Sequence, residues 1–577
     1  MHYTLSYKNP HQHLVDVRFS IPNINAEEIA VQLPAWRPGR YELGNFAQNI
    51  KTFQPKDSSG RKLSFQKATK DSWKIQTKGA RTVHIEYSYY ANELNAGSTF
   101  LDDAFLYVNP VNCLLYVPAR INEPCELELQ IPKNYMVACG LKKISPHKFS
   151  AAGYHELADC PFIASASLQK NHYSVERLVF NVWFQGAVQP DWKMLFADFK
   201  RFTEAQRQLF GSFPFGEYHF LFLSLPEKFY HGVEHSNSTV IALGPAYGMM
   251  SGKGYEDLLG VSSHELFHAW NVKAIRPVEM FPYDYSRENY SRLGYVAEGV
   301  TTYYGDLMLL RSGVFTEEQY LKTFNELLEK HFSNFGRMNL SVADSSFDTW
   351  LDGYKQGVPG RKSSIYTEGA LCAFVLDMLI RRKTGNKKSL DDLMRLLYEE
   401  FGKKQKGYSE NDYKTAAEKI AGVPLDDFFE NYLNGTSSYV PELTSSLDYL
   451  GYELQSLKKP LYTENALGLK TQAAGEKTIV SALFPNSPAD RAGLSLQDEI
   501  LAVNGMRVEN NLNDWCVHFS KEKKFTLTVS TGKRLREIVL TPDNNLYYLN
   551  YAVVRQGKLT PSQKNNWDAW SSAQKMN

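Results

Sequence analysis

Apolar and polar residues alternate along much of the first 170 residues. The stretches RTVHIEYSYYA (81–91) and CELELQI (125–131) place an apolar residue at every second position, and turn-forming sequences such as RPGR and DSSG separate such runs. A period of two is typical of a strand with one buried face. Because no long helical pattern occurs here, we expect an N-terminal β-sandwich-like domain over residues 1–170.

The pattern changes over residues 171–310, where strands and helices follow one another. The stretch DWKMLFADFKRFTEAQRQLFG (191–211) repeats apolar residues at helical spacing and ends at a glycine, and a further helix is expected over roughly 254–271. Apolar and β-branched runs typical of buried strands are VERLVFNVWF (175–184), YHFLFLSL (218–225) and NSTVIAL (237–243). These elements together predict an α+β domain.

Beyond residue 310 the chain is mostly helical, and we expect a helical domain over residues 311–450. The stretch TEGALCAFVLDMLIRRKTG (367–385) is an apolar helix that ends in basic residues and glycine. Three helix starts resemble capping boxes, in which a hydroxyl side chain and an acidic or amide side chain three positions later bind each other's backbone amides. These pairs are Thr316 with Gln319, Ser389 with Asp392, and Ser409 with Asp412.

Short strands return over residues 455–545. The stretch SPADRAGLSLQDEILAVNG (487–505) predicts a short helix, a strand and a tight turn at Asn504-Gly505, and it resembles the PDZ signature of bacterial protease-linked domains. In ALGLK (466–470) the residues Leu467, Gly468 and Leu469 are similar to the loop whose amides receive a peptide C-terminal carboxylate. The same loop could equally be a structural strand entry, with the domain only packing against its neighbour.

The end of the chain, residues 546–577, is expected to be a C-terminal strand followed by a polar, loosely ordered tail.

Charge and composition limit the classes of partner. The chain has 64 Lys plus Arg against 63 Asp plus Glu, a formal net charge of +1, so neither nucleic acid nor an anionic membrane surface is an expected partner. There is no apolar run long enough for a transmembrane helix and no signal-peptide pattern at the N-terminus. The 6 cysteines are scattered without CxxC pairs, which favours free thiols in a cytoplasmic protein. A disulfide among the four in the first 160 residues stays open.

The sequence HELFH at 264–268 predicts a metal site. His264 and His268 are four positions apart, so a helix places them on one face, and imidazole nitrogen is a preferred ligand of Zn²⁺. Glu265 lies next to the first histidine and could activate a water as a general base. The alternative is a helix that carries two histidines by chance.

A third ligand is suggested by Glu298, which lies 30 residues after His268 on a second predicted helix (292–310). Its neighbours are mostly apolar, and a carboxylate in such surroundings requires a cation. A glutamate on a solvated helix face is the alternative.

With these residues in view, the chain resembles the glycyl aminopeptidase family of HExxH zinc metallopeptidases, which have a thermolysin-like catalytic domain. The matching blocks are HELFHAWNVKAIRP (264–277), AEGVTTYY (297–304), LPAWRPGRYELGNFAQNI (33–50), YHGVEHSNST (230–239) and SSIYTEGALCAFVLDMLIR (363–381). The PDZ-like segment also fits this family, so the resemblance covers roughly residues 1–545. It implies a multi-domain α+β fold in which the helical domain completes the active-site cleft.

The resemblance also implies residue roles. His264, His268 and Glu298 would bind one Zn²⁺ per chain, Glu265 would activate the bound water, and Tyr366 in YTEG would hydrogen-bond the developing oxyanion. For Tyr366 the alternative is a packing tyrosine.

Glu234 in HGVEH matches the glutamate that binds the substrate's free amine, beside the strand 237–243 expected at the cleft edge. His235 stands where larger zinc aminopeptidases carry Asn, and the glycine register is shifted by one. A structural carboxylate or one that supports the metal ligands is therefore the alternative for Glu234. Asn271, Lys273 and Arg276 follow the motif helix and receive no role.

The function implied by the resemblance is a zinc aminopeptidase that removes small residues (Gly, Ala) from peptide N-termini. Two alternatives stay open. One is a zinc endopeptidase whose PDZ domain captures peptide C-termini, and the other is a non-catalytic peptide-binding scaffold. The complete set of His264, Glu265, His268, Glu298 and Tyr366 disfavours the scaffold.

Overall fold

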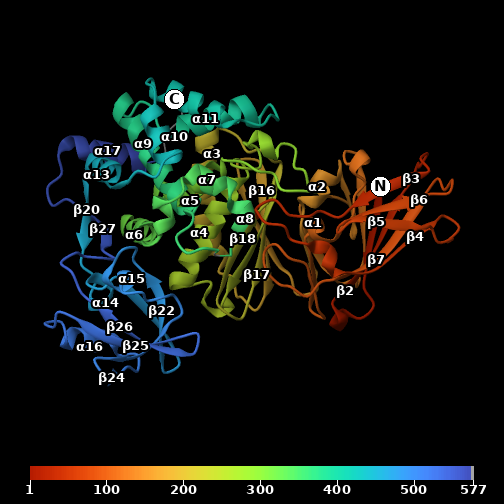
Figure 1. The fold of residues 1–577 in the computed structure, drawn as a ribbon. Helices are drawn as coiled ribbons and strands as arrows, with labels where there is room; N and C mark the ends of the chain where they lie inside the picture. Colours follow the sequence, from red (N-terminus) through yellow and green to blue (C-terminus); the bar gives the residue numbers. More distant parts are fainter. Residues whose placement is uncertain (356, 573–577) are drawn as a thin grey trace.

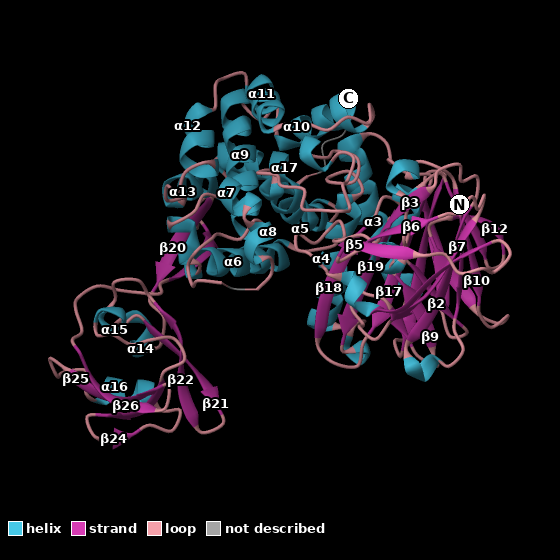
Figure 2. Cartoon of the chain, turned by 45° about the vertical axis from the view of Figure 1, so that its right-hand side comes forward, coloured by secondary structure: helices cyan, strands magenta, loops and turns pink. Residues whose placement is uncertain are grey.

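The computed structural model describes residues 1–355 and 357–572 (Figure 1). An N-terminal β domain lies at one end of the molecule, a layer of strands and helices lies in the middle, and a small domain near the C-terminus lies at the other end. Figure 2 shows that this last domain projects from the helical part on a narrow connection.

The N-terminal domain is built from three sheets around one apolar core. The largest has the order β12-β13-β10-β1-β2-β7-β4 and the others have the orders β11-β14-β9-β8 and β3-β6-β5. Strand β7 alternates buried and half-buried residues along its length, as its period of two predicts. The elements are β1 (His2–Ser6), β2 (Leu14–Ile21), β3 (Glu28–Gln32), β4 (Ile50–Asp57), β5 (Phe65–Thr69), β6 (Ser72–Gln76), β7 (Val83–Tyr90), β8 (Phe100–Leu101), β9 (Phe105–Val108), α1 (Pro110–Cys113), β10 (Cys125–Gln130), β11 (Met136–Cys139), β12 (Lys142–Ser145), β13 (Lys148–Ala151), α2 (Tyr154–Ala158) and β14 (Phe162–Ser165).

The central sheet has the order β15-β16-β17-β19-β18. Its strands are β15 (Gln169–Val175), β16 (Leu178–Gly186), β17 (Glu217–Ser224), β18 (Phe229–Glu234) and β19 (Ser238–Gly244). One face packs on helices and the other packs on residues of β9, β11 and β14 from the N-terminal domain. Because both faces are covered, β17 is buried almost throughout, which explains its continuous apolar run.

The edge of this sheet differs from the prediction. We expected residues 237–243 at the cleft edge, but the strand there, β19, pairs with β17 on one side and with β18 on the other. The edge strand is β18, and Glu234 is its last residue. The glycine and the polar residues of β18 hide its strand character, so only the sheet pairing identifies it.

The helices around the central sheet form one core with the helical domain. All three predicted capping boxes are present, at Thr316, Ser389 and Ser409. The expected helix 292–310 instead begins with a π-helical turn, η6 (Tyr295–Val300), before α5. The helices are α3 (Trp192–Phe210), α4 (Gly252–His268), α5 (Thr301–Arg311), α6 (Glu317–Ser333), α7 (Val342–Phe347), α8 (Thr349–Asp352), α9 (Thr367–Thr384), α10 (Leu390–Leu397), α11 (Glu410–Ala421), α12 (Asp426–Phe428) and α13 (Val440–Tyr449).

The PDZ-like domain has its own core and is joined to the helical domain by two strands, β20 (Tyr452–Leu457) and β27 (Asn550–Arg555), which pair with each other. Its sheet has the order β21-β22-β23-β25-β26. Phe484 of this domain packs edge-on against Phe335 at a ring-centroid distance of 4.6 Å. The elements are α14 (Tyr462–Asn465), β21 (Leu469–Ala474), β22 (Lys477–Leu483), α15 (Pro488–Arg491), β23 (Glu499–Val503), β24 (Met506–Arg507), α16 (Leu512–His518), β25 (Phe525–Thr531) and β26 (Arg534–Leu540).

The expectation of a loosely ordered tail is wrong for residues 561–571. Residues Pro561–Ser571 form helix α17, which begins with a capping box at Thr560, while residues 573–577 lie outside the described part of the chain. Trp570 is 2% exposed and donates a hydrogen bond of 2.8 Å to the hydroxyl of Tyr303. The segment is mostly polar in sequence, so its composition did not indicate that the indole of Trp570 is buried and anchors the helix.

Trp570→Ala is expected to lower the free energy of unfolding by about 3–5 kcal/mol, because it removes a large buried side chain from the shared core. Denaturant unfolding followed by circular dichroism measures this. The matched change Trp567→Ala, at a half-buried indole on the same helix, should cost less. Equal effects of the two changes would contradict the anchoring role of Trp570.

All six cysteines are free and buried, so the predicted free thiols are confirmed and the disulfide alternative is excluded. No helix within the described ranges is long and apolar enough to span a membrane.

Candidate metal centre

The motif helix α4 places His264 and His268 on one face, and their Nε2 atoms lie 3.0 Å apart. The Nδ1 atom of His268 lies 2.7 Å from the carbonyl oxygen of Asn271, a contact suited to an Nδ1–H donor. Such a bond directs the lone pair of Nε2 toward His264, as in histidines that bind metals.

Glu298 completes a set of three donors. Its Oε2 atom lies 3.3 Å from Nε2 of His268 and 3.9 Å from Nε2 of His264. Zinc–ligand bonds of 2.0–2.2 Å in a tetrahedron put donor atoms about 3.3 Å apart, so the three residues fit a zinc ion in spacing and in donor type. Glu234, Glu265 and His268 also lie within the distance of a common ion. Both groups share His268, so they describe neighbouring positions of one centre.

The π-helical turn that carries Glu298 is held from two sides. The side-chain amide of Asn271 donates to the carbonyl oxygen of Val296 over 2.8 Å. On the other side, a Cβ atom on Gly299 would come within 2.3 Å of the Cα atom of Gly369 in α9. The two glycines therefore allow α9, with Tyr366 at its start, to approach the turn closely. Such turns are frequent at functional sites.

Burial and charge set the protonation of the two histidines. Burial lowers the pKa of His264 well below its usual value, which favours the neutral form that binds metals. Burial acts the same way on His268, but the adjacent charge of Glu298 outweighs it and raises the pKa of His268 to about 10. The charge of Glu298 therefore favours a positive charge at this position.

Glu265 lies beside these donors with a free oxygen. Among the residues that the structure describes, its buried Oε2 atom has no hydrogen-bond partner. Burial is the main cause that raises the pKa of Glu265 well above its usual range. A Cβ atom on Gly232 of β18 would lie 2.1 Å from Oε1 of Glu265, so the strand and the carboxylate are in close contact at this glycine.

Glu234 lies at the end of the edge strand, and the N-terminal domain approaches it. Its buried Oε1 atom has no hydrogen-bond partner among the described residues. A Cβ atom on Gly39 would come within 2.5 Å of its carboxylate, and Gly39 has φ +83°. The charge of Glu234 is among those that act on the buried guanidinium of Arg37.

Sequence reasoning assigned no role to this N-terminal segment. Besides Arg37 and Gly39 it supplies Tyr41, whose hydroxyl donates to Oε1 of Glu298 over 3.4 Å. The block WRPGRY was noted only as part of the family resemblance. The close spacing of Trp, Arg, Pro, Gly and Tyr in this block was the signal in the sequence that pointed to the segment.

Tyr366 borders the same cavity of about 570 Å³ as the three donors, Glu265 and Glu234. Its hydroxyl lies 3.4 Å from the hydroxyl of Tyr354. The structure thus brings every predicted residue of the metal site, together with Glu234 and Tyr366, into one cavity.

The basic residues after the motif helix contact other parts of the protein. The ammonium group of Lys273 lies 2.7 Å from Oδ1 of Asp159 in the N-terminal domain, and both are largely buried. The Nδ1 atom of His235 lies 3.1 Å from the same oxygen. The guanidinium of Arg276 stacks over Tyr283 at 4.1 Å. This cluster ties the N-terminal domain to the strand that carries Glu234.

The predicted carboxylate loop lies far along the chain, in the PDZ-like domain. The side chains of Leu467 and Leu469 are buried in that domain's core, and the amide of Gly468 donates to the carbonyl oxygen of Glu464 over 3.2 Å. This amide is therefore already engaged within the chain.

Comparison with protein families places three segments of the chain. Residues 2–166 match the Peptidase M61 N-terminal domain, residues 257–372 match the M61 glycyl aminopeptidase, and residues 455–531 match the PDZ domain. These matches confirm the recognised family and the predicted multi-domain α+β architecture.

Solved structures give a similar result. The chain is similar to an aminopeptidase N family protein from Idiomarina loihiensis, with 26% identity and a TM-score of 0.89 over 99% of this chain and 100% of that one. An M1 zinc metallopeptidase from Deinococcus radiodurans with a bound Tyr-Ser-Ala substrate matches at 13% identity and a TM-score of 0.47, over 76% of this chain and 94% of that one. No curated protein matches the sequence.

Proposed function

We propose that this chain, which belongs to the M61 glycyl aminopeptidase family of metallopeptidases, is a zinc-dependent aminopeptidase that removes small N-terminal residues from peptides. The observation that carries the proposal is the meeting, in one cavity, of three candidate metal donors with the buried carboxylates of Glu234 and Glu265, each of which has one oxygen without a hydrogen-bond partner in the described part of the chain. The preference for small residues such as Gly and Ala rests on the family alone.

His264, His268 and Glu298 would hold one Zn²⁺. A bound zinc ion supplies Lewis acidity that polarises a carbonyl group and makes water more acidic. Glu265 takes the proton from the attacking water and passes it to the leaving amine nitrogen. Its Oε2 atom, which has no hydrogen-bond partner among the described residues, is available for both steps.

Tyr366 donates a hydrogen bond from its hydroxyl to the oxygen that becomes negative as the carbonyl is attacked. Burial raises the pKa of Tyr366 well above its usual value, so the hydroxyl stays protonated and available as a donor. Tyr366 precedes α9, so a helical domain over 311–450 contributes this residue to a catalytic domain over 171–310.

Glu234 pairs with the positive charge of the substrate's free amine. Because Glu234 ends the edge strand β18, a peptide that pairs with this strand as an added strand can place its first residue there. The free oxygen of Glu234 would then gain the partner that it lacks among the described residues. A carboxylate at this position favours cleavage of the first peptide bond over internal cleavage.

N-acetylation of the substrate's free amine is expected to lower kcat/KM by about 10- to 100-fold, because it removes a hydrogen bond between charged groups. Hydrolysis of a free-amine peptide and of its N-acetylated form by the wild type gives this ratio. Glu234→Gln should reduce the ratio, chiefly by slowing the free-amine substrate. Equal cleavage of both peptides by the wild type would instead favour the endopeptidase alternative and remove the role of Glu234.

A further inference from the structure

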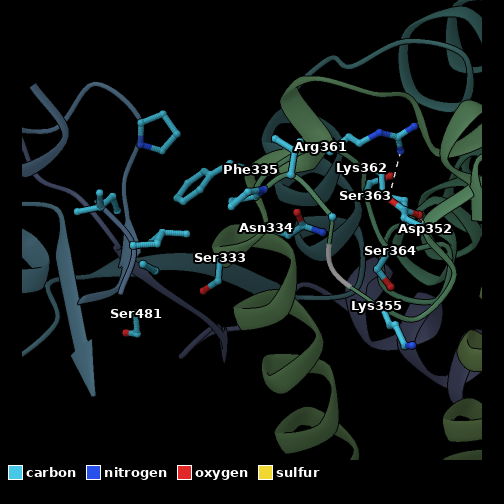
Figure 3. A pocket seen from close by; sticks show the side chains of 18 of the residues that line it. Ser333, Asn334, Phe335, Asp352, Lys355, Arg361, Lys362, Ser363, Ser364 and Ser481 are labelled. Carbon is cyan, nitrogen blue, oxygen red and sulfur yellow. Dashed lines mark hydrogen bonds and ion pairs between the residues drawn. The ribbon is translucent and has the colours of Figure 1, made fainter. Parts of the chain in front are cut away.

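A second cleft, of about 800 Å³, lies between the PDZ-like domain and the helical domain. We call it the PDZ cleft. Figure 3 shows Ser481 of the PDZ-like domain on one side, and the end of α6 with residues Arg361–Ser364 on the other side. The PDZ wall also includes Leu483, Pro485 and Leu496.

The PDZ cleft adjoins the cavity of the metal centre. Tyr366 lines both spaces. Tyr354 lines the PDZ cleft, and its hydroxyl lies within hydrogen-bond distance of the Tyr366 hydroxyl, at 3.4 Å. A molecule that fills the cleft therefore contacts the residue that supports the proposed oxyanion donor.

The walls of the PDZ cleft offer both apolar and polar contacts to an extended segment of chain. Leu483, Pro485 and Leu496 provide apolar contacts on the PDZ side, and Ser364 provides a hydroxyl on the other. The charge of Asp352 in the wall is paired with Arg361 and Lys362. Lys355 and Asp490 also line the cleft, so its walls combine apolar contacts for side chains with polar and charged groups that can bind peptide backbone.

The peptide-binding mode predicted from the sequence does not account for this cleft. Ser481 and Leu483 line the cleft from the end of β22, where a register shift interrupts the strand alternation and Leu483 also packs against the PDZ core. The carboxylate loop is not part of the lining, and the amide of Gly468 in that loop is bonded to Glu464. A chain in the PDZ cleft would therefore bind through its length and not through a terminal carboxylate.

We propose that the PDZ cleft holds the distal part of the same peptide whose N-terminus lies at the metal centre, so that oligopeptides are better substrates than dipeptides. The proposal rests on the proposed aminopeptidase function. The occupant is argued from the shared wall at Tyr366, because the PDZ cleft is the space next to the catalytic cavity into which a longer substrate can extend.

The test compares a dipeptide, a tetrapeptide and an octapeptide with the same N-terminal residue. We expect kcat/KM of the wild type to rise with length. Leu496→Glu should lower the octapeptide-to-dipeptide ratio of kcat/KM about tenfold, since it places a charge against the peptide. The matched change Leu535→Glu, at a 70% exposed leucine of the same domain outside the cleft, should leave the ratio unchanged.

Amidation of the octapeptide C-terminus should not change its rate, whereas capture by the carboxylate loop would require a free carboxylate. A wild-type kcat/KM that does not rise with peptide length would overturn the inference. An octapeptide-to-dipeptide ratio of kcat/KM that Leu496→Glu leaves unchanged would also overturn it. Either result would leave the proposed aminopeptidase function standing. A wild type loaded with zinc that cleaves none of the peptides overturns the proposed function itself.

A binding measurement gives an independent readout. The full chain with Glu265→Gln is incubated with an octapeptide that carries a benzophenone near its carboxyl end, and the irradiated product is mapped by mass spectrometry. Cross-links to residues 481–485 or 494–496 support the inference. Cross-links confined to residues 466–474 would show capture by the carboxylate loop and would contradict it.

Discussion

Glu265→Gln is expected to lower kcat by about 10²–10⁴-fold, because the amide cannot take the proton of the attacking water. The change keeps the shape of the side chain and leaves His264, His268 and Glu298 in place. Wild type and variant should therefore both carry about one zinc per chain. Steady-state hydrolysis of a free-amine peptide and elemental analysis measure the two quantities.

The matched control is Glu256→Gln, the same change on the same helix. The carboxylate of Glu256 is bound by Gln319 at 3.1 Å and Lys322 at 3.4 Å, so it is not free to take a proton from water. This control should keep kcat near that of the wild type. A Glu265→Gln variant that keeps its zinc and its full kcat would remove Glu265 as the base. A fully folded wild type without zinc would contradict the metal assignment.

Tyr366→Phe is expected to lower kcat by about 10²–10³-fold, the effect of removing one donor from an oxyanion site. KM should change little, because the hydrogen bond strengthens only as charge develops on the oxygen. Measurement of kcat and KM on one free-amine peptide separates the two contributions.

Tyr290→Phe serves as the comparison, since Tyr290 is 44% exposed and stacks on Phe347 outside the cavity. It should leave both constants unchanged. If Tyr366→Phe raised KM and left kcat intact, Tyr366 would be a binding residue and not an oxyanion donor. If neither constant moved, Tyr366 would be a packing tyrosine.

Helix positions follow closely from the sequence where local signals are strong. The capping boxes at Thr316, Ser389 and Ser409 and the terminal glycine at 211 mark real helix ends. These signals depend on hydrogen bonds between residues a few positions apart, so they are legible without the tertiary fold.

Elements whose stability depends on distant partners were predicted less well. Strand β18 exists because it pairs with β19, and helix α17 is held by the burial of Trp570 near Tyr303. The π-helical turn around Glu298 depends on Asn271 and on the close approach of α9 at Gly369. These contacts leave no pattern in the local sequence, although the capping box at Thr560 is a local signal for the start of α17.

The sequence by itself predicted the candidate metal donors His264, His268 and Glu298. Two histidines four positions apart on a helix must share a face, and a glutamate among apolar neighbours requires a cation. Only the tertiary structure decided what surrounds these donors: Arg37, Gly39 and Tyr41 come from the N-terminal domain, and Tyr366 connects the metal centre with the PDZ cleft. The physical reason is that a metal-binding helix is a local structure, whereas a substrate cavity is formed where separate domains pack together.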